Sequence, residues 1–297
     1  MPERIDDLAA SFRRHLRAEG RSERTATIYG QALRFHAAWL VSHGRPATLD
    51  ELSRAGISAW LAELADTHEP STVRTRYKGL RRFCRWLVAE GELAVDPMTN
   101  LEVPMVQDKP VPVLTDTELA GLLRACAGKG FNQRRDEVIV RLLLDCGLRV
   151  SELSGLNVGD VDLDREMAIV TGKGHKVRPV YFGARTARAL DRYLRERRKH
   201  RRAHEDALLL SQRGRLSPDG IRDTLKVRAA VAGIADLHPH RFRHTWAHDY
   251  LLAGGQERDL KRLAGWSSDT MLERYGSSAA DVRARESTKR MRRGDRV

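Results

Sequence analysis

Four prolines between residues 94 and 113 divide this chain of 297 residues into two parts. A proline has no backbone N–H to donate and biases the residue before it toward an extended conformation, so regular helices do not run through such a stretch. The segment also lacks helical periodicity, and the chain is of a length typical of two domains. We therefore predict a helical domain over residues 1–95, a linker over 96–112 and a second domain over 113–297.

The part before the linker contains four amphipathic segments. Apolar residues recur at helical spacing and predict helices over residues 5–16, up to Gly44, over 54–65 and from Ser71 to Gly91. Ser71 is a good N-cap, and glycine ends a helix readily because it adopts left-handed backbone angles. The predicted buried face of the second helix carries Ile28, Ala32, Phe35 and Trp39. The polar face of the fourth helix is rich in arginine.

The part after the linker combines helices with a short region of strands. Thr115 and Glu118 have the spacing of a capping box, which starts its first helix. Residues 160–182 favour strands, and the glycine-containing turn at 171–175 predicts a β-hairpin. Helices are predicted over residues 116–127, 135–146, 185–201, 218–232, 240–253 and 257–264, with two short ones near 269–275 and 279–291. The predicted fold class is mainly α with a small antiparallel β-sheet, a helical domain followed by an α+β domain.

The chain is strongly basic, with a formal net charge of +13 and an isoelectric point near 10.1. Such a balance favours a polyanionic partner, because each Lys or Arg near a phosphate releases bound counterions. The alternative is a basic surface that only keeps the protein soluble. The charged run RERRKHRRAH at 195–204 is interpreted as a solvated helix end rather than a dedicated site.

The three cysteines, Cys84, Cys126 and Cys146, lie far apart in the sequence and fit neither a disulfide framework nor a zinc spacing. Free cysteines of this kind are expected in a reducing cytoplasm. The charged first residues are not a signal peptide, and no apolar run approaches the roughly 20 residues that a membrane span needs. We therefore expect a cytoplasmic protein without a membrane partner.

Two basic side chains of the second part lie at positions from which they can reach a ligand. Arg149 follows the glycine that ends one helix and precedes the next helix, so fixed backbone can direct its guanidinium into a cleft. Lys173 lies between two glycines at the predicted hairpin tip, where it can move. Each residue alone also fits an ordinary basic surface position.

A helix near residue 240 carries imidazoles beside a guanidinium. His240, Arg243 and His244 share one face, and a cation next to an imidazole suits an anionic substrate. The four-residue spacing of His240, His244 and His248 raises the alternative of a metal site. We disfavour it, because no glutamate stands where a zinc-protease pattern requires one and the neighbouring arginine repels a divalent cation.

A last segment places Trp266 directly after a helix-ending glycine and Tyr275 at the end of the next predicted helix. Together the segments resemble the tyrosine recombinase family, also called the phage integrase family, in its Xer- and Cre-like two-domain form. The family pattern reads Arg, Lys, His-x-x-Arg, His or Trp, then Tyr. This chain has, in that order, Arg149, Lys173, His240, Arg243, Trp266 and Tyr275.

The local sequences GLRVSEL, TGKGHKVRPV, HPHRFRHTWA and LAGWSS and the nine-residue step from Trp266 to Tyr275 also match the family. The resemblance is strong over residues 110–280, whereas residues 1–95 resemble the family's core-binding domain in size, charge and helix content. The family more often has His at position 266, and Phe242 replaces the usual Leu. Neither departure affects the expected activity.

The resemblance implies strand cleavage and rejoining of double-stranded DNA, without a metal or another cofactor. Arg149 and Arg243 would bind the two non-bridging oxygens of the scissile phosphate. Trp266 would orient the phosphate, since an indole N–H donates a hydrogen bond but cannot transfer a proton at this step. A tetramer of the protein on two DNA sites would supply four active sites.

In the same scheme Tyr275 attacks phosphorus and forms a 3′-phosphotyrosine with a free 5′-hydroxyl. The tyrosine hydroxyl has a pKa near 10 and needs a proton acceptor, for which His240 is the candidate. Lys173 is the candidate acid for the leaving 5′-oxygen. Glu152 resembles a supporting acidic position of the family, and His244 is expected to support the site as well.

Two alternative functions use the same residues differently. A type IB topoisomerase shares the chemistry but relaxes DNA without strand exchange, and the N-terminal helical domain fits a recombinase better. A catalytically silent, integrase-like DNA-binding protein is the non-enzymatic alternative, against which every family position is filled. The residues fit a chromosome resolvase and a phage or mobile-element integrase equally well.

Overall fold

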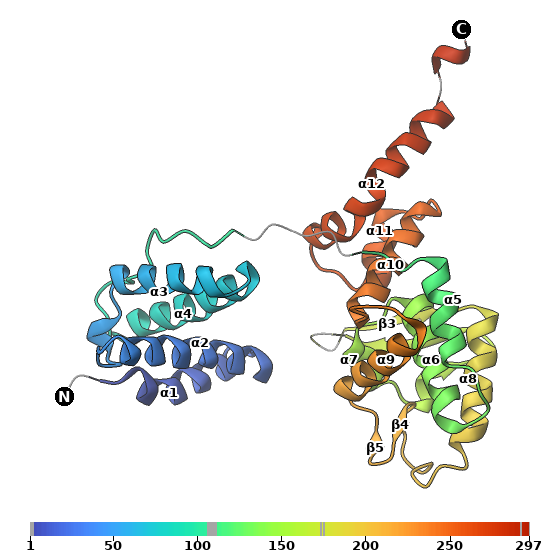
Figure 1. Cartoon of the computed structure of the whole chain (residues 1–297), viewed down its shortest axis with the longest axis horizontal. Helices are drawn as coiled ribbons and strands as arrows, with labels where there is room; N and C mark the ends of the chain where they lie inside the picture. Colours follow the sequence, from blue (N-terminus) through green and yellow to red (C-terminus); the bar gives the residue numbers. More distant parts are fainter. Residues whose placement is uncertain (1–2, 106–111, 173, 175, 292, 297) are drawn as a thin grey trace. The chain divides into compact units, whose positions relative to one another are not determined.

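The structure is a computed structural model that describes residues 3–105, 112–172, 174, 176–291 and 293–296 (Figure 1). The side chains of residues 270, 273–279, 281–282, 286, 293 and 296 lie outside this description. The chain forms two compact units, Met1–Asp108 and Lys109–Val297. The helices and small antiparallel sheets confirm the predicted fold class.

Unit 1 is a bundle of helices around one apolar core. Its elements are α1 (Ile5–Ala18), α2 (Glu23–Ser42), the short 3-10 helix η1 (Leu49–Glu51), α3 (Arg54–Thr67) and α4 (Pro70–Glu90). Helix α2 packs between α1 and α4. The largest fully buried side chains of these helices are those of Phe12, Trp60, Tyr77 and Phe83. The four predicted helices of this part are therefore confirmed.

Two details of the predicted helices were wrong. Phe35 was expected on the buried stripe of α2, but its side chain is 50% exposed and the Arg76 guanidinium lies 4.0 Å from its ring centroid. The buried face is rotated toward Leu33, His36 and Leu40, because α2 is covered from two sides. Helix α4 begins at Pro70 rather than after Ser71, since proline suits the first turn of a helix, where its missing N–H would have had no partner.

The chain after α4 continues to pack on unit 1. Gly91 ends the helix with a left-handed φ of 81°, as predicted. Met98, within the proline-rich stretch, is fully buried in the core of this unit. The Tyr77 hydroxyl donates a hydrogen bond to the carbonyl oxygen of Leu101 at 2.5 Å. Residues 106–111 of the stretch lie outside the described part of the chain.

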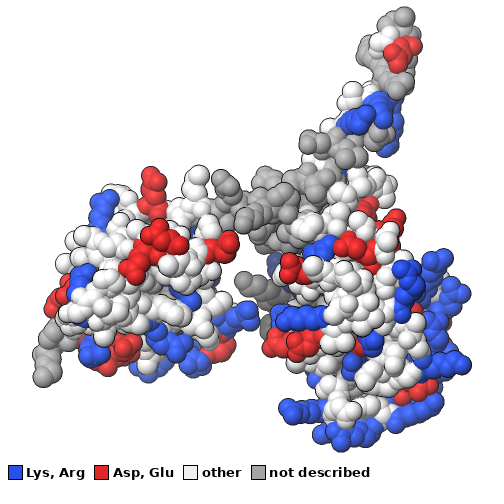
Figure 2. All heavy atoms as spheres, in the orientation of Figure 1, with Lys and Arg blue, Asp and Glu red and all other residues white. Residues whose placement is uncertain are grey.

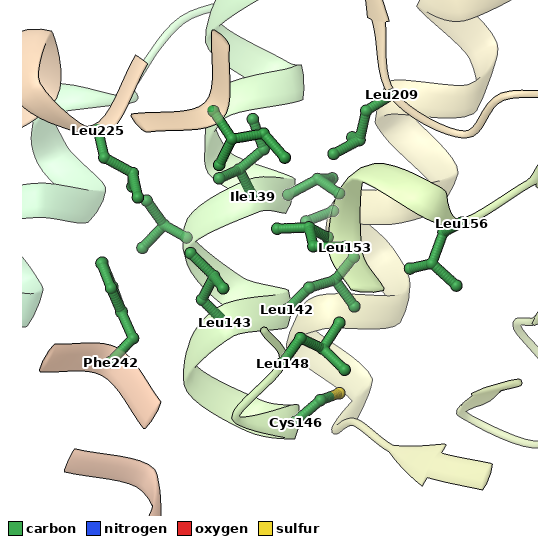
Figure 3. Packing of buried hydrophobic residues seen from close by; sticks show 14 of the residues in the cluster. Ile139, Leu142, Leu143, Cys146, Leu148, Leu153, Leu156, Leu209, Leu225 and Phe242 are labelled. Carbon is green, nitrogen blue, oxygen red and sulfur yellow. The ribbon is translucent and has the colours of Figure 1, made fainter. Parts of the chain in front are cut away.

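Unit 2 is organised around α6, whose apolar side chains are covered by neighbouring helices (Figure 3). The predicted capping box of Thr115 and Glu118 starts α5, and both of its hydrogen bonds are present. Leu142 and Leu143 of α6 lie in the same core as Phe242 of α10. The helices of this unit are α5 (Asp116–Ala125), α6 (Phe131–Cys146), α7 (Val150–Gly155), α8 (Ala184–Arg197), α9 (Pro218–Ala232), α10 (Pro239–Leu252), α11 (Glu257–Ala264) and α12 (Asp269–Met291), with the 3-10 helices η2 (Val158–Asp160) and η4 (Arg293–Arg296).

The predicted hairpin forms part of a three-stranded antiparallel sheet. Its strands are β1 (Val161–Asp162), β2 (Met167–Thr171) and β3 (Val177–Tyr181), in the order β1-β2-β3. The register pairs Val170 with Arg178. A second sheet of β4 (Leu210–Ser211) and β5 (Gly214–Arg215) was not predicted, because two-residue strands leave no alternation of polar and apolar residues to detect.

The end of the chain differs from the prediction of two short helices. A single helix, α12, runs from Asp269 to Met291 and packs against α10. Gly276 lies between the two predicted helices, yet a glycine inside a helix costs only about 1 kcal/mol relative to alanine. Among the residues that the structure describes, none of the helices combines the length and apolar character that crossing a bilayer requires.

Basic side chains cover part of the surface of unit 2. Figure 2 shows Lys and Arg side chains gathered over α8 and the β4–β5 turn of unit 2. On other parts of this face, acidic side chains lie among the basic ones. Exposed members of this group include Arg188, Arg195, Arg198, Arg201 and Arg213. Within the run 195–204, the exposed cations fit the predicted solvated helix end. Arg197 does not, because it is buried and donates to the carbonyl oxygens of Ala207 and Leu208.

The buried His36 makes unit 1 sensitive to acid. Burial and the nearby charge of Arg45 lower the pKa of His36 from 6.5 to about 4. The ring contacts Trp60 edge-on at 4.9 Å between centroids, and neither ring nitrogen has a hydrogen-bond partner among the described residues. As pH falls below 6.5, the unfolded chain therefore binds a proton that the folded chain excludes.

We predict that the free energy of unfolding decreases by about 2 kcal/mol between pH 7 and pH 5 through His36 alone. The loss should level off near pH 4, where the folded state also takes up the proton. Urea unfolding followed by tryptophan fluorescence measures it, with His36→Leu as the matched control. Equal pH dependence in the two proteins would contradict the prediction.

Candidate active site

The junction between α6 and α7 fixes Arg149 through both its backbone and its side chain. Gly147 ends α6 with a φ of 56°, and Arg149 is the N-cap residue of α7. The Arg149 backbone N–H donates to Glu152 Oε2 at 2.9 Å, and Arg149 Nη1 donates to Glu152 Oε1 at 2.7 Å. One carboxylate thus orients the guanidinium, whose side chain remains 31% exposed.

The Glu152 carboxylate is buried and also binds a second arginine. Arg178 of β3 donates to both of its oxygens, each at 2.9 Å. Burial by itself raises the pKa of Glu152, but the hydrogen bonds and charge of Arg178, with the hydrogen bonds from Arg149, outweigh it and lower the pKa. Glu152 therefore stays ionised at neutral pH.

Helix α10 buries Arg243 in the centre of this region. The Arg243 side chain donates from Nη1 to the Gly147 carbonyl oxygen at 2.6 Å and from Nη2 to the Ala264 carbonyl oxygen at 2.5 Å. Its guanidinium thus links the end of α6 to the end of α11. A guanidinium is planar and permanently charged, so these two bonds fix the direction of a positive charge at this point.

The C-terminal end of α11 collects three guanidiniums. The carbonyl oxygens of Leu263, Ala264 and Gly265 accept hydrogen bonds from Arg178 Nε at 2.7 Å, Arg243 Nη2 at 2.5 Å and Arg149 Nη2 at 3.4 Å, respectively. The last carbonyls of a helix have no partner within the helix and carry partial negative charge. This end of α11 can therefore hold cations together that would otherwise repel one another.

Trp266 follows directly on this helix end. Gly265 has a φ of 63°, which turns the chain, and the Trp266 side chain is 94% buried, leaving 6% exposed. The Arg243 guanidinium lies 5.3 Å from the centroid of its ring, within the range of a cation–π contact. The predicted neighbours Arg149, Arg243 and Trp266 are therefore brought together in the structure.

His240 stands one turn before Arg243 on α10, and its side chain is exposed. Partial desolvation, followed by the charges of His238, Arg243 and Arg149, lowers the pKa of His240 below 6.5. The imidazole is therefore mostly neutral at pH 7 and can accept a proton.

The three histidines with four-residue spacing do not share one environment. His240 is exposed, whereas His244 is buried and His248 is half-buried. Within the part of the chain that the structure describes, no three His, Cys, Asp or Glu side chains are grouped to hold a metal ion.

Two predicted site residues cannot be located in full. Lys173, between β2 and β3, lies outside the described residues, although the Gly172 N–H bonds the Lys176 carbonyl oxygen at 2.8 Å at the base of the same turn. Tyr275 belongs to α12, and its side chain is likewise outside the description. The first turn of α12 packs Met271 and Leu272 on the cluster that contains Trp266.

Arg178 is the site residue to which the sequence interpretation gave no role. Its signal lies in the alternation of β3, where Val177, Pro179 and Tyr181 are exposed while Val180 is buried. Arg178 shares the face of Val180. An arginine on the inward face of a strand must have a buried partner, so the pattern predicts an acidic residue opposite it.

The chain is similar to one known family of DNA recombinases and to individual relatives within it. The model of the phage integrase family matches residues 112–281, and that of the phage integrase N-terminal SAM-like domain matches residues 9–91. The tyrosine recombinase XerC of Mycobacterium leprae (strain TN) is 35% identical over 268 residues, which cover 86% of this chain and 89% of that protein. XerC of Mycobacterium tuberculosis (strain ATCC 25177 / H37Ra) is 36% identical over 266 residues, covering 86% and 88%.

Solved structures share the fold. A XerH site-specific recombinase bound to a palindromic difH substrate, in a post-cleavage complex, has a TM-score of 0.75 at 15% identity and covers 91% of this chain and 81% of its own. A lambda integrase (75-356) dimer bound to a COC' core site has a TM-score of 0.71 at 16% identity, covering 91% and 94%. At these identities the likeness concerns the arrangement of the elements.

The Gly147 junction generates a stability prediction. A Cβ at Gly147 would lie 2.2 Å from Trp246 Cε3, whereas one at Gly233, which has a similar left-handed φ of 69°, meets nothing within 4 Å. Gly147→Ala should cost roughly 3 kcal/mol, and the control Gly233→Ala about 1 kcal/mol from backbone strain alone. Urea unfolding measures both, and equal losses would show that the contact with Trp246 is unimportant.

Proposed function

The chain belongs to the phage integrase family and is a site-specific tyrosine recombinase that cleaves and rejoins DNA, and on this premise we propose that Tyr275 is its nucleophile. Five further side chains would assist the reaction. They are Arg149, Lys173, His240, Arg243 and Trp266. The observation that carries this proposal is the convergence of Arg149 and Arg243 on the end of α11, next to Trp266.

We propose that the two guanidiniums bind the non-bridging oxygens of the scissile phosphate. A phosphodiester resists attack because its negative charge repels nucleophiles, and the charge grows in the pentavalent transition state. Arg149 and Arg243 are held before substrate arrives, by Glu152 and by backbone carbonyls, so little reorganisation accompanies binding. Trp266, packed under Arg243, would orient the phosphate with its indole N–H rather than transfer a proton.

We propose that the bond exchange proceeds in line at phosphorus. The Tyr275 oxygen forms a bond to phosphorus while the bond to the 5′-oxygen breaks, which leaves a 3′-phosphotyrosine. His240 takes the phenol proton, and Lys173 gives a proton to the departing 5′-oxygen. A 5′-hydroxyl from a second strand can reverse the step, because the ester stores the bond energy; the scheme calls for no ATP, metal or other cofactor.

Supporting roles are proposed for Glu152 and His244. Glu152 orients Arg149, as its hydrogen bonds indicate. His244 is buried on α10 immediately after Arg243 and would keep that helix in place rather than touch DNA.

The DNA partner is proposed to be a duplex that both units contact. A net charge of +13 favours binding to phosphates. The lambda integrase structure is that of a dimer on a core site, and exchange between two duplexes requires four active sites. We therefore propose that four copies assemble on two DNA sites, with the helical unit 1 as the core-binding part and residues 113–297 as the catalytic part.

The cytoplasm is the proposed location, since the substrate is DNA. The three cysteines are buried and free, which suits a reducing compartment. Burial raises the pKa of Cys126 to about 12, so this thiol stays protonated and is a poor nucleophile.

Tyr275→Phe tests the nucleophile directly. A duplex with a nick close to the cleavage position loses a short fragment after attack, so a covalent protein–DNA adduct accumulates. We predict an adduct with the natural chain and none with Tyr275→Phe, while both bind the duplex with affinities within about threefold. Binding without an adduct in the natural chain would support a silent DNA-binding protein, and supercoil relaxation without recombinant product would support a topoisomerase.

The lowered pKa of His240 sets the pH dependence of cleavage. The second-order rate constant for adduct formation reports the free enzyme, so it should vary less than about twofold between pH 8 and pH 6.5 and fall at more acidic pH. His240→Gln should lower the rate by roughly 100-fold and remove the acidic decline. An acidic midpoint above pH 6.5 would argue against this assignment.

A further inference from the structure

We propose that Arg178 is a positioning residue for strand cleavage, joining the carboxylate that orients Arg149 to the helix end that precedes Trp266. The inference rests on the proposed phosphate-binding roles of Arg149 and Trp266. Arg178 itself is not assigned to the phosphate, since its three guanidinium nitrogens donate to Glu152 and to the Leu263 carbonyl oxygen. Three contacts of the Arg178 guanidinium support the positioning role.

The first contact holds the Glu152 carboxylate in one orientation. Arg178 Nη1 and Nη2 bind Oε1 and Oε2 in parallel at 2.9 Å each, and the same two oxygens receive the Arg149 side chain and backbone N–H. A bidentate pair fixes the plane of the carboxylate as well as its position. Without Arg178, Glu152 would lose two of these four hydrogen bonds in a buried setting and would turn toward other partners.

The charge of Glu152 also depends on Arg178. Burial of this carboxylate raises its pKa, and the hydrogen bonds from Arg178 are the largest influence that lowers it again. Loss of Arg178 would therefore favour the protonated acid. A neutral Glu152 attracts the Arg149 guanidinium less strongly, so Arg149 would lose its fixed direction.

The second contact reaches the end of α11. Arg178 Nε donates to the Leu263 carbonyl oxygen at 2.7 Å. A Cβ placed on Gly265 would lie 3.2 Å from Arg178 Nη1, so the guanidinium packs closely against the residue that precedes Trp266. Arg178 thereby ties Glu152, and with it Arg149, to the backbone that sets the position of Trp266.

The third contact concerns the base of the β2–β3 hairpin. Arg178 pairs with Val170 across the sheet, and a Cβ on Gly172 would lie 3.2 Å from Glu152 Oε1 and 3.4 Å from Arg178 Nη1. The described β2 end of this hairpin, next to the segment that contains Lys173, therefore packs on the same ion pair. One buried guanidinium connects three segments that supply proposed site residues.

The test uses the nicked-duplex adduct assay with the full chain at saturating DNA. We expect Arg178→Gln to slow the first-order rate of adduct formation by roughly 10- to 100-fold, comparable to loss of an orienting partner, while DNA affinity stays within about threefold. The control Arg165→Gln removes an arginine of the β1–β2 turn whose side chain is 79% exposed, and it should react at the natural rate.

A double-mutant cycle distinguishes positioning from a merely structural role. If Arg178 acts through Arg149, the effect of Arg178→Gln depends on Arg149. The fold-decrease in rate that Arg178→Gln causes should then be at least about fivefold smaller in an Arg149→Lys background than in the natural chain. If the effects of the two substitutions on the rate simply multiply, the inference is overturned. It is also overturned if Arg178→Gln reacts at the natural rate, or if Arg178→Gln loses DNA affinity in parallel with its rate. Should Arg178→Gln fail to fold, Arg178→Lys enters the same cycle under the same criteria, because it keeps the charge but not the bidentate geometry.

Failure of this inference is separable from failure of the proposed function. An adduct that persists in Tyr275→Phe would overturn the proposed function. It would also remove the basis for the role of Arg178. A Tyr275-dependent adduct that forms at the natural rate in Arg178→Gln would overturn only the role of Arg178.

Discussion

The buried carboxylate of Glu152 receives four hydrogen bonds from Arg149 and Arg178, and the geometry of the site depends on them. An isolated buried carboxylate would be costly, and two guanidiniums side by side would repel one another. Each group therefore stabilises the other in its ionised form. Because Glu152 is also the third residue of α7, the ion pairs are anchored to regular backbone, and the exposed end of Arg149 faces outward with little freedom to reorient.

Helix ends perform the remaining positioning. Gly147 and Gly265 both have left-handed backbone angles, and each ends a helix with carbonyl oxygens directed at arginine side chains. The partial negative charge of these carbonyls offsets the repulsion among Arg149, Arg178 and Arg243. In its described hydrogen bonds Arg243 donates to backbone carbonyls, which carry only partial negative charge. This positive charge supports the proposed phosphate-binding role of Arg149 and Arg243.

Where the sequence failed, tertiary contacts outweighed local preference. Phe35 has the spacing of a core residue, but two helices cover α2 and rotate its buried face, so Phe35 lies outside under Arg76. Gly276 and its neighbours resemble a helix break, yet packing of α12 on α10 sustains one helix through them. The start of α4 is a different case, because two local preferences compete there: Pro70 suits the first turn and begins the helix before Ser71 could cap it. For Gly276, the local cost of about 1 kcal/mol was smaller than the packing that opposed it.

The sequence by itself determined the helices with their caps at Thr115, Gly91 and Gly147, the fold class and the family pattern of site residues. These features depend on neighbours within a few residues, whose spacing is written in the chain. Only the tertiary structure decided that Arg178 shares Glu152 with Arg149, and that carbonyls of α11 gather three arginines from β3, α7 and α10. Such contacts join residues up to 116 positions apart, and their distances follow from how helices and strands pack rather than from periodicity.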